Sequence, residues 1–204
     1  MEFQQVVQQR RMVRRFTSAP VARSSVKRMV RNAVRAPSAG FTQGWAFLVL
    51  DQPAEVEQFW EATTPPSRTV QPDAWLRGMR TAPVIIVPLS SKDAYLSRYA
   101  EPDKGWTDRD EKRWAMPYWH IDTGMAAILI LQTAVDEELG ACFFGIPAER
   151  TARLRSSFDI PADYTPIGAI AVGHPAPKVQ ARGSVAKRAR KPLDQVVHYG
   201  RWAR

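Results

Sequence analysis

Cysteine and histidine are scarce in this chain of 204 residues, which has one Cys and three His. Cys142 has no second cysteine for an internal disulfide, and no Cys or His neighbours stand at the spacing of a metal site. We therefore expect no bound metal and a reducing, cytoplasmic setting. His120, His174 and His198 are scattered along the sequence and are expected to be ordinary core or surface residues.

Long hydrophobic runs are also missing. The longest run, Met125 to Leu131, is far shorter than the roughly 20 apolar residues that span a bilayer. The first nine residues are mostly polar and lack the apolar segment of a signal peptide. We expect a soluble protein without a membrane partner.

Several catalytic signatures are absent from the sequence. It has no three-glycine dinucleotide fingerprint and no Gly-x-Ser-x-Gly nucleophile elbow, and no pair of carboxylates stands out for glycosidic chemistry. A chain without side chains arranged for acid–base work is typical of an enzyme whose cofactor carries the chemistry.

Acidic residues are missing between Arg10 and Arg35, a stretch that holds nine of the 29 Lys and Arg residues. The last 27 residues hold eight more basic residues and a single acid, Asp194, whereas the middle of the chain is net acidic. The formal net charge of +9 therefore belongs to the two ends of the chain. The acidic middle, and the lack of a helix-turn-helix or RNA-binding signature, argue against a basic nucleic-acid-binding module, the alternative from another class.

The arginines near the N-terminus could hold an anion. On a helix, Arg10 and Arg14 would project to one side, and two guanidiniums so placed could hold a phosphate through paired hydrogen bonds. The alternative is an ordinary solvated basic face. If the two ends of the chain meet, the joint repulsion between this cluster and the one around Arg188 and Arg190 favours a bound anion.

Periodicity predicts a single domain, residues 1–204, of the α+β class. We expect helices over 1–10, from Ser24 or Ser25 to just before Pro37, from about Pro53, over 121–139 with Gly140 as its stop, and over 147–158. We expect strands over 45–50, 84–89, 141–146 and 166–173. Residues 90–118 are rich in charged and aromatic side chains and are expected to form an excursion, either a lid or an arm that contacts a partner.

Two loops offer free backbone amides. The small residues Ser38, Ala39 and Gly40 would let the backbone approach a flat ring closely, although an ordinary helix-to-strand turn is equally consistent with them. Gly145 ends a predicted strand just before a predicted helix, another place where amides point outward.

Five segments, in this order, resemble the FMN-dependent nitroreductase family. They are an Arg-Arg-x-x-Arg-x-Phe opening, a small-residue loop, a Gly-x-Cys-aromatic-x-Gly strand, a strand bounded by prolines, and a basic run before a Pro-Leu-x-x-Val-Val-His ending. In this chain they occupy residues 10–16, 36–45, 140–145, 166–175 and 188–198. The resemblance covers nearly the whole chain and is thin between about residues 63 and 118.

The resemblance implies a nitroreductase-like fold, with a central mixed β-sheet flanked by helices around a long buried helix, in a domain-intertwined homodimer. It implies two FMN molecules at the subunit interface, NAD(P)H as electron donor, and a small oxidised acceptor that resembles a nitroaromatic or a quinone. The flavin N5 would carry the chemistry, so no side chain is expected to be catalytic.

The resemblance also assigns residues. The FMN phosphate would be held by basic residues of both chain ends, and the partner subunit's small-residue loop would cover the ring. The end of the Gly-x-Cys strand would line the other face, with a backbone amide on the N5 side. The implied cofactor-binding residues are Arg10, Arg11, Met12, Arg14, Pro37, Ser38, Ala39, Gly40, Phe144, Gly145, Ile146, Arg188 and Arg190. The implied substrate-pocket residues are Phe41, Tyr95, Tyr99, Trp106 and Trp114.

The chain departs from the family pattern beside the cofactor. Met12 stands where a polar Ser is usual, Phe41 replaces an Asn, Gly44 replaces a Pro, and Glu138 replaces a Gly. Relatives of this family bind a deazaflavin coenzyme, convert FMN to dimethylbenzimidazole or remove halogens. The substituted ring contacts and the basic ends keep a deazaflavin-dependent reductase as an alternative to FMN.

Overall fold

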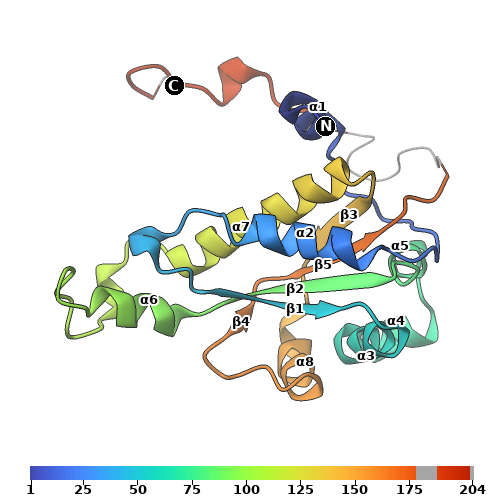
Figure 1. The fold of residues 1–204 in the computed structure, drawn as a ribbon, viewed down its shortest axis with the longest axis horizontal. Coiled ribbons are helices and arrows are strands. Elements are labelled where there is room, and N and C mark those ends of the chain that lie inside the picture. Colours follow the sequence, from blue (N-terminus) through green and yellow to red (C-terminus); the bar gives the residue numbers. More distant parts are fainter. Residues whose placement is uncertain (178–187, 203–204) are drawn as a thin grey trace.

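One antiparallel sheet organises the molecule (Figure 1). The computed structural model describes residues 1–177 and 188–202, so the basic residues within 178–187 lie outside the described residues. The sheet order is β1-β2-β5-β3, with β4 paired to β2. The strands are β1 (Trp45–Leu50), β2 (Val84–Ser90), β3 (Gly140–Phe144), β4 (Thr165–Pro166) and β5 (Ala169–Gly173).

The expected α+β class, with helices flanking one sheet, is confirmed, but all pairs of these strands are antiparallel and the sheet is not mixed as the resemblance implied. The parallel pairing found in the described residues is an isolated bridge between Met12 and Ala141. Hydrophobic runs predict where strands form, but not the direction in which they pair.

Helices cover both faces of the sheet. Figure 1 shows α2 and α7 on one face and α3 and α8 on the other. The helices are α1 (Phe3–Gln9), α2 (Arg23–Ala33), α3 (Pro53–Thr63), α4 (Pro66–Val70), α5 (Ala74–Met79), α6 (Lys92–Tyr99), α7 (Tyr118–Asp136) and α8 (Thr151–Ser157). Short 3-10 turns lie at Ala39–Phe41, Glu111–Arg113, Ala148–Arg150 and Leu193–Gln195.

Strand β2 is buried along its whole length, which explains its uninterrupted apolar sequence. Ile85 and Val87 pack into a cluster with α3, α5 and α8, whereas Val84 and Ile86 pack into a cluster with α2 and α7. Alternate side chains of a strand point to opposite faces, so this one strand contributes to both halves of the core.

The expected N-cap of α2 and the expected stop of α7 are wrong, and α7 begins at Tyr118 rather than at Ile121. Helix α2 begins at Arg23 after Ala22, and the Ser25 hydroxyl donates to Glu137 (2.6 Å) instead of capping the helix. Gly140 does not stop α7, because it is already the first residue of β3. The left-handed residue after α7 is Glu138 (φ 57°). A non-glycine residue in this role is uncommon, so the sequence pointed to the nearby glycine.

The C-terminal residues 188–202 form no sheet or long helix. Figure 1 shows this segment projecting past α1, beyond the outline of the rest of the molecule. Its large apolar side chains Leu193, Tyr199 and Trp202 are exposed. Among the described helices, none combines the length and the apolar character that crossing a membrane requires.

Candidate functional site

The arginine-rich segment Arg10–Phe16, here called the arginine strap, runs along the edge of the sheet. The first helix, expected over 1–10, ends at Gln9, so Arg10 and Arg14 do not project from one side of a helix. The Val13 amide donates to the Ala141 carbonyl (2.9 Å). A Cβ on Gly140 would lie 2.9 Å from the Val13 side chain, so glycine allows this close approach.

Other elements fix the backbone of the strap from further directions. The Thr81 hydroxyl donates to the Phe16 carbonyl (3.0 Å), and the Ala176 amide donates to the Arg15 carbonyl (3.0 Å). Gly78 of α5 lies so close to the Arg14 carbonyl that any side chain there would clash. The strap therefore has a defined backbone from which its guanidiniums project.

The guanidiniums of the strap are available to an anion. Arg11 and Arg14 are exposed and Arg10 is half-buried. Within residues 1–177 and 188–202, the contact recorded for these guanidiniums is a bond from Arg14 Nη1 to the Met12 carbonyl (3.3 Å). Burial raises the pKa of the Cys142 thiol on β3, and the charge of Arg14 opposes that rise.

The end of β3 presents backbone rather than side chains. The Phe144 ring stacks on Trp60 (5.5 Å between centroids, 7° between planes), and therefore belongs to the aromatic cluster under α3. Ile146 also packs against that cluster. Gly145 is exposed, and a Cβ there would meet no atom within 4 Å. In the part of the chain that is described, its amide donates to no group, so it is free to face a ligand.

The Pro37–Gly44 loop is held mostly by its own contacts and by neighbouring helices. The Ala39 amide donates to Asp122 Oδ2 (2.8 Å), so it is not free to bond a cofactor. The Ser38 hydroxyl accepts from the Gln43 amide (2.9 Å). Pro37 is exposed, and Phe41, with a left-handed backbone (φ 54°), leaves 76% of its surface exposed.

The aromatic excursion is a packed cluster beside this loop. Tyr99 lies 4.9 Å from Trp106 and 4.5 Å from Trp114, measured between ring centroids, and all three are half-buried. Tyr95 is completely buried, and its hydroxyl donates to Asp122 (2.7 Å). Desolvation and this bond raise the pKa of Tyr95, which keeps the phenol protonated. Tyr95 therefore supports the cluster from inside, where a substrate does not reach it.

The arginine strap and the Pro37–Gly44 loop lie in separate parts of one chain. Figure 1 shows α6 and the loop that follows α2 at one end of the sheet, while the strap runs past β3 and α5 toward the other end. Arg188 and Arg190 are exposed on the segment that projects past α1. The arrangement joins the strap to β3 and the loop to the aromatic excursion, but it does not gather both groups around one point within the chain.

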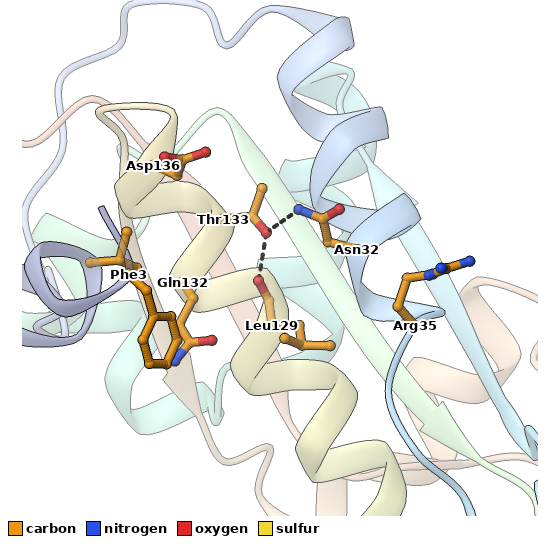
Figure 2. Close-up of a pocket in the computed structure, with 8 residues that line it drawn as sticks. Phe3, Asn32, Arg35, Leu129, Gln132, Thr133 and Asp136 are labelled. Carbon is orange, nitrogen blue, oxygen red and sulfur yellow. Dashed lines mark hydrogen bonds between the residues drawn. The ribbon is translucent and has the colours of Figure 1, made fainter. Parts of the chain in front are cut away.

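A separate hollow lies between α1, α2 and α7 (Figure 2). It measures about 390 Å³ and contains none of the residues that the sequence analysis singled out. Its lining residues are Phe3, Val6, Asn32, Arg35, Leu129, Gln132, Thr133 and Asp136. Among the described residues, no group of three or more His, Cys, Asp or Glu side chains could hold a metal ion.

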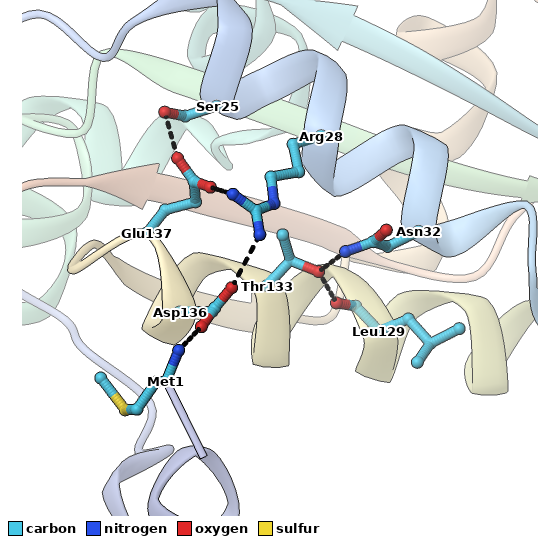
Figure 3. Close-up of polar contacts among 8 residues, drawn as sticks. All are labelled: Met1, Ser25, Arg28, Asn32, Leu129, Thr133, Asp136 and Glu137. Carbon is cyan, nitrogen blue, oxygen red and sulfur yellow. Dashed lines mark hydrogen bonds and ion pairs between the residues drawn. The ribbon is translucent and has the colours of Figure 1, made fainter. Parts of the chain in front are cut away.

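Polar contacts next to this hollow join the same three helices (Figure 3). Arg28 of α2 pairs with Asp136 (3.3 Å) and Glu137 (2.9 Å) at the end of α7, and the Met1 ammonium also pairs with Asp136 (2.5 Å). The Asn32 amide donates to the Thr133 hydroxyl (2.9 Å). These contacts account for part of the basic charge of α2 without any ligand.

Asp122 and Arg98 hold the loop and were not predicted from sequence. The signal for Asp122 was a carboxylate within the most apolar helix of the chain, where an unpartnered charge would be costly. Arg98 donates from Nε to the Gly40 carbonyl (3.0 Å), and nothing in its sequence context distinguishes it from the other charged residues of the excursion.

Comparisons with known proteins agree on one family. The sequence matches the Nitroreductase family over residues 7–174. It is 25% identical over 201 residues to an NADPH-dependent oxidoreductase of Staphylococcus aureus strain MRSA252, covering 97% of this chain and 72% of that protein.

Solved structures share the fold. A nitroreductase family protein from Clostridium difficile 630 superposes with a TM-score of 0.71 at 17% identity, covering 99% of this chain and all of that one. A protein assigned as a nitroreductase and solved in complex with FMN, from Desulfovibrio desulfuricans, superposes with a TM-score of 0.66 at 23% identity, covering 94% and 98% of the two chains. With the family match spanning residues 7–174, this chain belongs to the nitroreductase family.

Proposed function

We propose that the chain is a flavin-dependent oxidoreductase that passes electrons from NAD(P)H through FMN to a small oxidised acceptor. The observation that carries the proposal is the pairing of the arginine strap with the end of β3. The bridge from Met12 to Ala141 places the backbone of the strap beside the strand that leads to the open Gly145 amide.

The residues present fit FMN. A phosphate requires cationic donors on a defined backbone, which Arg10, Arg11 and Arg14 supply. A flat ring requires backbone that it can approach closely, which Gly145 supplies because no atom lies within 4 Å of its Cβ position. Bound FMN would supply the two-electron chemistry, which is consistent with the absence of an acid–base set from the sequence.

This chain's own residues would bind and orient the cofactor. The guanidiniums of the strap would neutralise the phosphate, and the Gly145 amide would donate a hydrogen bond on the N5 side of the ring. The stack of Phe144 on Trp60 keeps the end of β3 rigid, so the amide is held in one direction.

A second copy of the chain would complete the site. The Pro37–Gly44 loop lies away from the strap of its own chain, so only the loop of a partner subunit could cover the same ring. The partner's Arg188 and Arg190 are the remaining candidates for the phosphate. Exposed Ile121 and Ile128 on α7 offer an apolar surface for such a homodimer.

The acceptor would stack on the open side of the ring. The half-buried rings of Tyr99, Trp106 and Trp114, together with exposed Phe41, favour a flat acceptor of the nitroaromatic or quinone class. The names of the Staphylococcus relatives favour NADPH as the donor.

Cofactor binding tests the proposal. FMN is titrated into apoprotein, and binding is followed by quenching of flavin fluorescence. The double variant R10A/R14A is expected to weaken FMN binding by about 100-fold or more, because each charge-assisted bond contributes roughly 1.5–3 kcal/mol.

R153A is the control, since Arg153 is exposed, as Arg14 is, but lies on α8. Equal FMN affinity in R10A/R14A and R153A would overturn the phosphate assignment. If the wild-type protein does not bind FMN but binds a deazaflavin coenzyme, the proposed cofactor changes to the deazaflavin and the fold assignment stays the same.

A further inference from the structure

Asp122 is a carboxylate buried inside the molecule, with 1% of its surface exposed. Its Oδ2 accepts two hydrogen bonds, from the Ala39 amide (2.8 Å) and from the Tyr95 hydroxyl (2.7 Å). These donors lie 83 and 27 residues away in the sequence. One oxygen atom therefore joins α7, the Pro37–Gly44 loop and α6.

Further contacts tie the same loop to α6. Arg98 donates to the Gly40 carbonyl (3.0 Å), and the Ser91 amide donates to the Gly44 carbonyl (2.8 Å). A Cβ on Gly40 would lie 2.8 Å from the Tyr99 ring, and one on Gly44 would lie 2.6 Å from the Tyr95 ring. The loop thus lies directly on the tyrosines of α6.

The loop contains three residues in an unfavourable backbone conformation. Gly40, Phe41 and Gln43 all have left-handed backbones (φ 60°, 54° and 52°). Left-handed geometry is unfavourable for residues with side chains and persists where surrounding contacts impose it. Some of these contacts lie within the loop, such as the bonds of the Phe41 and Gln43 amides to Ser38, and the others come from Asp122 and α6.

Stability alone does not account for a buried carboxylate in this position. An apolar side chain of the same shape would avoid the cost of removing a charge from water. Asp122 instead fixes the position of the loop relative to α6 and α7, because its oxygen accepts from one backbone amide and one hydroxyl at defined places.

We propose that Asp122 is a positioning residue that holds the Pro37–Gly44 loop in the conformation that covers the flavin bound by the partner subunit. This inference rests on the proposed function, in which that loop closes over the ring. It also assigns a role to the excursion at 90–118: α6 within it is a fixed support for the loop, not a lid.

The test compares D122L with D122N. In D122N the amide oxygen can accept both bonds, so the loop geometry is expected to remain even if the protein becomes less stable. In D122L both bonds are lost. Hydrogen exchange of the cofactor-free protein should show faster exchange at the Ala39 amide in D122L and little change in D122N. FMN affinity should fall about 10-fold or more in D122L only.

T133V is the matched control. Thr133 lies on the same helix, is similarly buried, and bonds to Asn32 and to the Leu129 carbonyl rather than to the loop (Figure 3). T133V should lower the melting temperature while leaving Ala39 exchange and FMN affinity unchanged. If D122L does not fold, Y95F, which removes only the hydroxyl donor, should show the same changes to a smaller extent.

The outcomes separate the two proposals. Wild-type protein that binds FMN, with D122L or Y95F binding it equally well and protecting the Ala39 amide equally, would overturn the positioning role alone. Wild-type apoprotein that fails to bind FMN would overturn the proposed function, and the positioning role with it. If T133V loses as much FMN affinity as D122L, Asp122 contributes only to overall stability and does not position the loop.

Discussion

At the scale of single residues, glycine decides whether the loop can lie against α6. Gly40 combines a left-handed backbone (φ 60°) with contact so close that a Cβ would lie 2.8 Å from the Tyr99 ring. Replacing Gly40 with Ala is expected to lower the free energy of unfolding by about 2 kcal/mol or more, because the backbone cost and the steric cost add. Denaturant titration measures the loss.

A control at Gly105 measures the backbone cost without the steric cost. It also has a left-handed backbone (φ 72°), but no atom lies within 4 Å of its Cβ position. G105A should therefore lose only the backbone term, about 1 kcal/mol. If G40A and G105A lose equal stability, the contact with Tyr99 contributes nothing and the loop is not packed as described.

At the scale of elements, α5 supports the arginine strap and depends on its N-cap. The Asp73 carboxylate accepts from the Leu76 amide (2.7 Å), a bond that lowers the pKa of Asp73. D73A is expected to cost about 1 kcal/mol at pH 7. Because the folded pKa lies below the unfolded one, the stabilisation is present above about pH 4 and is lost as the pH falls through the folded value.

Asn at position 73 is the control for that pH dependence. Asn also caps helices but does not titrate, so D73N should stay more stable than D73A even at acid pH. Unfolding free energies of the three proteins between pH 7 and pH 2 test this. A difference between wild type and D73A that is independent of pH would show that ionisation of Asp73 does not stabilise α5.

Elements with their own hydrophobic pattern were predicted well. Strand β1 has the predicted bounds and β2 extends one residue further, because both carry apolar side chains at almost all positions. The placement of Arg10 and Arg14 on one side of a helix was wrong, because the chain is extended from Arg10 onward. Its extended shape comes from the bond of Val13 to Ala141 and from the contact between Gly78 and Arg14, and such distant partners leave no local pattern in the sequence.

At the scale of the whole molecule, motif order in the sequence was sufficient for the family, and the match over residues 7–174 confirms it. The geometry of the site could not be predicted from the sequence as well as the family. The sequence could not show that the Ala39 amide is already bonded to Asp122, or that Tyr95 is buried. Both facts depend on α6 and α7 packing around the loop, which only the folded chain determines.

The proposed homodimer can be tested on one exposed face of α7. Ile121 and Ile128 of α7 leave 40% and 37% of their surfaces exposed, although they belong to the most apolar helix of the chain. If this face joins two copies, I128E should give a monomer in light scattering, because a buried isoleucine contributes about 1.5–3 kcal/mol and a buried unpaired charge is costly. The monomer should also bind FMN much more weakly, since each site would lack the partner's loop.

V70E is the matched control for this charge. Val70 is more exposed than Ile128 and lies on α4, next to α3 on the other side of the sheet (Figure 1). V70E should keep both the dimer and the FMN affinity of the wild type. Circular dichroism must show that I128E is folded, and I121E provides a second substitution on the same face. A folded I128E that remains dimeric and binds FMN normally would place the interface, and with it the shared cofactor site, elsewhere on the molecule.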